Sequence, residues 1–226
     1  MNSAAIWALI AIAPLVVLTL TSFVKLSVVL SLVRNAIGAP DAPSGLVVTG
    51  VALVLTFFVM SPVAVDMVHA AVTVPAAPAA PAMPKATDGS VDQAVRQLVP
   101  AEYQPQLDAA ERAIVPLEAF LAKHAGQADK DTFVGLAKKL GKDVKGDELW
   151  VLAPAFVASE LREAFAIAVL IFIPFLVIDL VVALGLASLG LQASSPQTIA
   201  LPFKLLLFVA VDGWRLLLES LLRGYM

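Results

Sequence analysis

The sequence predicts an all-α membrane protein in which two long helical hairpins flank a small polar helical domain. Hydrophobic residues fill 60% of the 226 positions and charged residues 15%, whereas soluble domains carry about 45–50% and about 25%. The mean hydropathy is +0.89. The charges are also unevenly placed, because 23 of the 33 lie between Lys85 and Glu163. One polar segment therefore interrupts an otherwise apolar protein.

Four apolar stretches are each longer than the roughly 18 residues at which a membrane helix is expected. They span residues 4–33, 46–71, 164–191 and 196–222. Within each pair the connection is short and rich in Gly, Pro, Asp or small polar residues, so each pair is expected to pack as an antiparallel hairpin. Each stretch contains a proline, which predicts kinked helices; these are Pro14, Pro62, Pro174 and Pro202.

These features divide the chain into four parts. They are a first hairpin at 1–72, a proline-rich linker at 73–84, a polar helical domain at 85–158 and a second hairpin at 159–226. Proline recurs at every third position of the linker, which favours an extended polyproline II spacer.

Two helices are expected in the polar domain. Leu107, Ala110, Ile114, Leu117 and Leu121 follow helical spacing. A second helix is predicted after Asp129, as its N-cap, with Gly141 just past its end. A polar, partly disordered loop is the alternative. The three basic residues Lys25, Arg34 and Lys204 lie toward the short connections, which by the positive-inside rule places the polar domain on the periplasmic side.

The composition argues against several classes of function. A net charge of −3 offers no basic field for nucleic acid. There is no cysteine for a thiolate nucleophile or ligand, and the two histidines are 55 residues apart. No hydrolase, phosphate-loop or dinucleotide motif is present. We therefore expect no enzyme activity, no metal and no cofactor.

The few charges inside the apolar stretches need partners, because a lone ion in a membrane helix costs at least about 2.5–3.5 kcal/mol. The first stretch carries only Lys25. In the last stretch, read as one helix, the charged residues fall within one 80° arc; they are Lys204, Asp212, Arg215 and Glu219. The last three can neutralise one another.

Lys204 lies too far from the rest of this stripe and needs an acid from another helix. Glu160, Glu163 and Asp179 are the candidates. Ser159 before Glu160 is expected to be the N-cap of a helix that runs to Leu191.

Two alternative functions use these acids. An ion-coupled transporter would use Asp66, Asp179 and Asp212 as a proton relay, although the hairpins show no inverted repeat. An intramembrane aspartyl protease would use Asp179 and Asp212 as a dyad, although no GxGD motif accompanies them.

Several motifs resemble the FliP/SctR family (YscR and HrcR among its members) of type III secretion export-apparatus proteins. The resemblance rests on SELR at 159–162, IPFLVIDL at 173–180 and LPFKLLLFVAVDGW at 201–214. TSFVKLSVVLSLVRNAIGAP and LTFFVMSPV in the first hairpin are also similar. Flagellar members usually start with a cleavable signal peptide and none is evident here, which favours the injectisome branch.

The resemblance implies an inner-membrane protein that forms a homo-oligomeric ring, a pentamer, with FliQ/SctS-like and FliR/SctT-like membrane proteins. This assembly would be the entrance pore of the export gate for unfolded substrate proteins. It further implies a salt bridge between subunits that joins Glu160 and Lys204. Relatives often close the pore with a methionine-rich loop. Here the corresponding gate loop has no methionine, and its residues include Leu189, Leu191, Gln192, Ala193 and Ser194.

Overall fold

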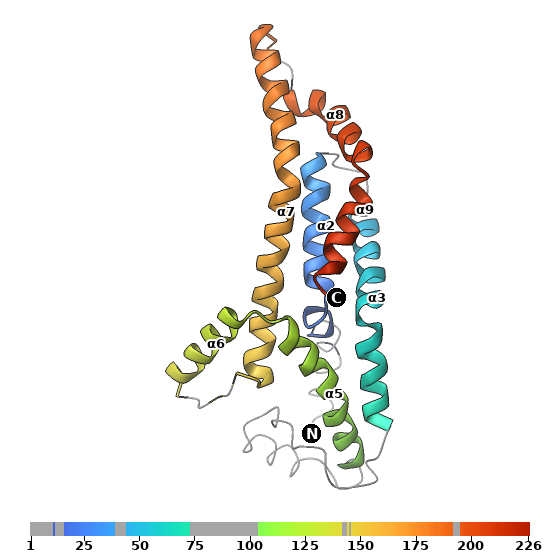
Figure 1. Cartoon of the computed structure of the whole chain (residues 1–226), viewed down its shortest axis with the longest axis vertical. Coiled ribbons are helices and arrows are strands. Elements are labelled where there is room, and N and C mark those ends of the chain that lie inside the picture. The colour runs from blue at the N-terminus through green and yellow to red at the C-terminus, as the bar shows by residue number, and fades with distance from the viewer. Residues whose placement is uncertain are drawn as a thin grey trace. The chain divides into compact units, whose positions relative to one another are not determined.

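All regular elements in the described part of the chain are α-helices, which confirms the all-α prediction. The computed structural model describes residues 16–38, 44–72, 104–141, 146–191 and 195–226, together with Ala11 and Val144. In chain order the helices are α2 (Phe23–Ile37), α3 (Gly45–Val72), α5 (Gln104–His124), α6 (Gln127–Lys139), α7 (Leu149–Ser188), α8 (Pro196–Ala210) and α9 (Gly213–Arg223) (Figure 1).

The chain forms two compact units that both draw on distant parts of the sequence. One comprises residues 1–21 and 60–160, and the other comprises residues 22–59 and 161–226. The first unit holds the polar helices α5 and α6, and the second holds α2, α8 and α9.

In the described part of the chain, two helices are long and apolar enough to cross a membrane. They are α3, with 28 residues, and α7, with 40. At 1.5 Å per residue α7 is about 60 Å long, roughly twice the hydrocarbon thickness of a bilayer. Pro62 and Pro174 lie inside α3 and α7, and both helices continue through them. Pro14 and the linker lie outside the described residues.

Packing in the second unit is centred on α2. Leu26, Val29, Leu30 and Val33 recur at helical spacing and are at most 3% exposed. They form one cluster with side chains from α3, α7, α8 and α9: Val48, Ala52, Ala164, Phe175, Phe208, Leu217 and Leu221. The helix ends at Gly38, whose φ of 80° is favourable for glycine.

The last apolar stretch is two helices, so the prediction of a single charged stripe is wrong. Helix α8 ends at Ala210, and Asp212 adopts a left-handed conformation (φ 51°) before α9 begins. Lys204 therefore lies on α8, whereas Arg215 and Glu219 lie on α9. A Cβ at Gly213 would clash with the ring of Phe208, so only glycine fits at this turn.

The first unit confirms the predicted helices of the polar domain and corrects where two helices begin. Helix α5 covers the repeat of apolar residues, and Leu121 at its end is fully buried. Helix α6 begins at Gln127, so Asp129 lies in its first turn and is not its N-cap. It ends at Lys139, close to the expected Gly141, whose φ is 77°.

Helix α7 begins at Leu149, eleven residues before the predicted start at Glu160, so the N-cap assignment of Ser159 is wrong. The segment from Leu149 to Ala158 is apolar, and its residues Val151, Leu152, Ala155 and Phe156 are buried. The Phe156 ring packs 5.7 Å from that of Phe120 on α5. Burial against α5 favours helix here.

Gly213→Ala tests the close approach at the α8–α9 turn. The added methyl must displace the Phe208 ring, and such overpacking typically costs about 1–3 kcal/mol. We expect a lower midpoint in thermal unfolding of the detergent-solubilised chain. The matched control is Gly185→Ala in α7, where the new Cβ would have open space. Equal midpoints for the two variants would contradict the assignment.

Candidate functional site

The second unit contains two buried lysines, and each is held by a carboxylate of α7. The Lys25 Nζ lies 2.7 Å from the Glu163 Oε2, and the lysine side chain is 1% exposed. The Nζ also lies 4.3 Å from the centre of the Tyr225 ring, within cation–π range. This pair connects α2 to α7 and to the chain after α9.

Lys204 is held in the same manner by a different acid. Its Nζ lies 2.7 Å from the Asp179 Oδ2 and donates to the backbone carbonyl of Ala36 at 3.2 Å. Ala36 is in the last turn of α2, where the negative end of the helix dipole favours a cation. Lys204 therefore joins α8 to α7 and to the end of α2.

These contacts assign two of the three acids that remained open for Lys204. Asp179 binds Lys204, and Glu163 binds Lys25. Glu160 is 1% exposed and lies in the first unit. The Glu160–Lys204 bridge implied by the resemblance joins two subunits and stays a prediction.

The second oxygen of Asp179 is the least satisfied atom of this site. The Asp179 Oδ1 is buried and has no hydrogen-bond partner among the described residues. Lys204 carries three N–H donors and uses two of them. The site therefore has hydrogen-bonding capacity left on both partners.

The charged residues of α9 form an exposed set. The Arg215 Nε donates to the Glu219 Oε1 at 2.9 Å, as the i, i+4 spacing predicts. Arg223, just past the end of the fourth apolar stretch, lies 3.7 Å from the same carboxylate. Both arginines are more than 70% exposed. Such a pair contributes little to folding and is available at the surface.

The predicted gate loop begins where α7 ends. Gly190 has a φ of 72°, and the Leu191 N–H donates to the Leu186 carbonyl, which forms a Schellman ending. Leu189 and Leu191 are 72% and 50% exposed. Gln192, Ala193 and Ser194 lie outside the described residues.

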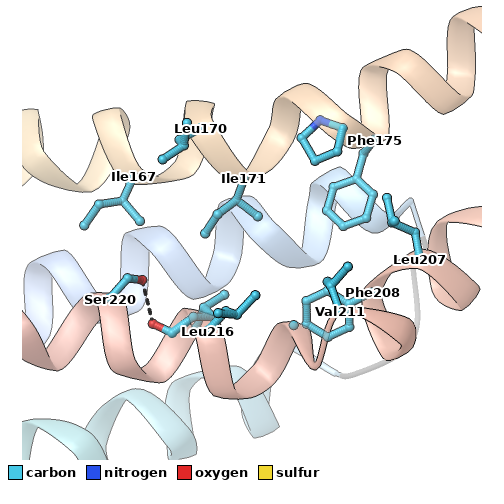
Figure 2. A pocket seen from close by; sticks show the side chains of 12 residues that line it. Ile167, Leu170, Ile171, Phe175, Leu207, Phe208, Val211, Leu216 and Ser220 are labelled. Carbon is cyan, nitrogen blue, oxygen red and sulfur yellow. Dashed lines mark hydrogen bonds between the residues drawn. The ribbon is translucent and has the colours of Figure 1, made fainter.

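A hollow of about 400 Å³ lies between α7 and the α8–α9 turn. Figure 2 shows Ile167 and Ile171 on one side and Phe208 and Val211 on the other. Its walls are apolar, and the Ser220 hydroxyl donates to the carbonyl of Leu217 in its own helix. Among the described side chains that line the hollow, Ser220 is the one with a polar group.

The acids required by the two alternative functions are not arranged as those functions need. Asp179 is engaged by an ammonium group, and Asp212 is exposed at the α8–α9 turn. Asp66 lies exposed on α3 in the first unit.

Glu118 on α5, in the polar domain, has a raised pKa. Burial raises the pKa of the Glu118 carboxyl, and the charge of Asp147 raises it further. The Glu118 Oε1 is buried without a hydrogen-bond partner in the described part of the chain. Its ionisation therefore opposes folding.

Comparison with known proteins decides the family, because residues 6–221 match the FliP family. The chain belongs to the FliP family. Its relatives include a flagellar biosynthetic protein FliP of Pectobacterium carotovorum, which is 42% identical over 94% of this chain and 73% of the relative. The hypersensitivity response secretion protein HrcR of Ralstonia nicotianae is 38% identical over 96% of this chain and 93% of the relative. The virulence protein YscR of Salmonella typhimurium is 34% identical over 96% of this chain and 93% of the relative.

Membership in this family confirms the resemblance drawn from the SELR, IPFLVIDL and LPFK motifs. The structure adds a role within the chain for residues of these motifs, since Asp179 and Lys204 form an ion pair. It also adds the Lys25–Glu163 pair. The lone charge in the first apolar stretch was the signal for that pair, but sequence alone could not name the partner.

The Asp179→Asn variant tests the buried pair. Removing one partner leaves the buried Lys204 ammonium uncompensated, which typically costs about 3–5 kcal/mol. We expect a large fall in the free energy of unfolding in detergent. Glu219→Gln is the control, because its arginine partners are exposed, and it should leave stability unchanged. Equal effects of the two variants would contradict the role of burial.

Glu118 predicts a pH dependence of the polar domain. Because its pKa is higher in the folded state, folding is favoured below the pKa of the unfolded chain, and this contribution is lost as the pH rises through the folded value. Glu118→Gln should remove this component from the pH profile of thermal unfolding. A profile identical to that of the parent chain would contradict the assignment.

Proposed function

We propose that this chain is a core component of the type III secretion export gate, where it lines the entrance pore through which unfolded proteins leave across the inner membrane. Family membership over residues 6–221 carries the proposal. Its relatives bear the names of flagellar biosynthesis, hypersensitivity secretion and virulence proteins. The function of the chain is thus protein secretion, and the comparisons give no support to the ion-coupled transporter.

A large uncovered apolar surface supports a role inside a membrane assembly. Many large hydrophobic side chains of α7 are more than half exposed, among them Val169, Leu170, Leu180, Val181 and Leu184. A soluble monomer rarely exposes a contiguous apolar face of this kind. We infer that lipid and neighbouring subunits cover it.

The proposed assembly is a ring of copies of this chain, a pentamer, with FliQ/SctS-like and FliR/SctT-like membrane proteins. In the ring, Glu160 of one copy pairs with Lys204 of the next. The polar domain lies on the periplasmic side, and the loop after α7 narrows the pore. The gate loop works through leucines, because Leu189 and Leu191 project into solvent where relatives often carry methionine.

Charge reversal at Lys204 tests the subunit contact. Lys204→Glu should abolish the oligomer on native gels and secretion of a reporter substrate, because it opposes two acids. Adding Glu160→Lys should partly restore the oligomer, as it rebuilds the pair between subunits. Adding Asp179→Lys should restore only the stability of the single chain, as it rebuilds the pair within it.

The results of these variants distinguish the Glu160–Lys204 pair between subunits from the Asp179–Lys204 pair within the chain. Full assembly of the Lys204→Glu variant would contradict the proposed contact. Rescue of the oligomer by Asp179→Lys alone would show that the pair within the chain is the one that assembly requires. Proton flux through the purified chain without its partners would favour the transporter.

A further inference from the structure

A buried serine of α7 forms hydrogen bonds with the α5–α6 corner, the turn of the polar domain around residues 122–130. Ser159 is 1% exposed and lies in the eleventh position of α7. Its hydroxyl accepts from the backbone N–H of Gly126 at 2.7 Å and donates to the Asp129 Oδ2 at 2.5 Å. The carbonyl of Ala155 lies 2.9 Å away in the same helix. All these residues belong to the first unit.

The α5–α6 corner is also stabilised by hydrogen bonds between its own residues. The Lys130 Nζ donates to the carbonyl of Ala122 at 2.6 Å, which satisfies a free carbonyl in the last turn of α5. The Ala125 N–H donates to the carbonyl of Leu121. Leu121 and Ala125 are at most 6% exposed. The partners of Ser159 are therefore held in place independently of the serine.

The polar domain also forms hydrogen bonds with the end of α3. The Arg112 guanidinium on α5 donates to the carbonyls of Ala70 and Ala71, at 3.2 and 3.4 Å. These carbonyls belong to the last turn of α3, and the last four carbonyls of an α-helix have no N–H donor within the helix. Helix α5 thus connects the end of one long apolar helix to the side of the other.

The position of Ser159 gives this connection a consequence for assembly. Glu160 follows it directly, so the two side chains leave the α7 axis about 100° apart. Rotation of α7 about its axis would break both bonds of the Ser159 hydroxyl. Because the serine fixes that rotation, it also fixes the direction in which Glu160 points.

We infer that Ser159, with Asp129 and the Gly126 N–H, is a positioning site through which the polar domain orients Glu160 for pairing with the next subunit. The inference rests on the proposed function, since it deepens the role of the Glu160–Lys204 contact. It assigns the polar domain a part in assembly.

A double-mutant cycle on oligomer formation tests the inference, with Ser159→Ala and Glu160→Gln made singly and together. The readout is the fraction of chain in the oligomer on native gels, normalised to the amount of chain in the membrane. We expect Ser159→Ala to lower this fraction about fivefold to tenfold, as for the loss of one buried hydrogen bond. In the Glu160→Gln background it should have no further effect, because Ser159 acts through Glu160.

Further variants separate positioning from folding. Ser159→Thr keeps the hydroxyl and should retain most of the oligomer. Ser188→Ala, also in α7, removes an exposed hydroxyl that donates to the Gly185 carbonyl of its own helix, and it should have no effect. If Ser159→Ala is absent from the membrane, Asp129→Asn replaces it in the cycle, because that change keeps the bond to Gly126.

The possible failures are distinct. If Glu160→Gln leaves the oligomer intact, the proposed subunit contact is wrong. The inference that Ser159 positions Glu160 is then wrong as well. If Glu160→Gln lowers the oligomer but Ser159→Ala has no effect, or an effect that adds fully to it, Ser159 does not position Glu160. In that case the proposed function stands and the inference is overturned.

Discussion

The need to neutralise lysine inside an apolar protein organises the second unit. Lys25 and Lys204 are almost fully buried, and a buried ammonium is tolerated only when it is paired and hydrogen-bonded. Both find their carboxylates on α7, four helical turns apart between Glu163 and Asp179. Helix α7 therefore serves as the common partner against which α2 and α8 are held in register.

A related rule acts on neutral groups in the first unit. The ends of α3 and α5 expose backbone carbonyls, and these are satisfied by the side chains of Arg112 and Lys130. The N–H of Gly126, before α6, is satisfied by Ser159. Each of these bonds joins one helix to another, so satisfying the helix ends also sets how the helices pack.

The broken last helix links these constraints to the proposed assembly. The turn at Asp212 and Gly213 separates the buried Lys204 from the exposed Arg215, Glu219 and Arg223. A single straight helix would carry all of them on one face. The break leaves one cation inside the unit and presents the remaining charges at its surface, where neighbouring subunits or solvent can meet them.

Local properties of the sequence determined the all-α class, the long apolar helices, the helices of the polar domain and the family. Composition, helical spacing and contiguous motifs are all properties of neighbouring residues, so they can be read without the fold. The Arg215–Glu219 pair was predictable for the same reason, because four positions separate its members on one helix.

Only the tertiary structure decided which acid holds which lysine, where α7 begins and why Gly213 breaks the last helix. The contact of Lys204 with Ala36 spans 168 residues, and the bond of Ser159 to Gly126 spans 33. Ser159 followed by Glu160 has the local pattern of a helix start, yet burial of the preceding residues against α5 extends the helix through it. Partners so far apart in the chain leave no periodic signal, because only packing brings them together.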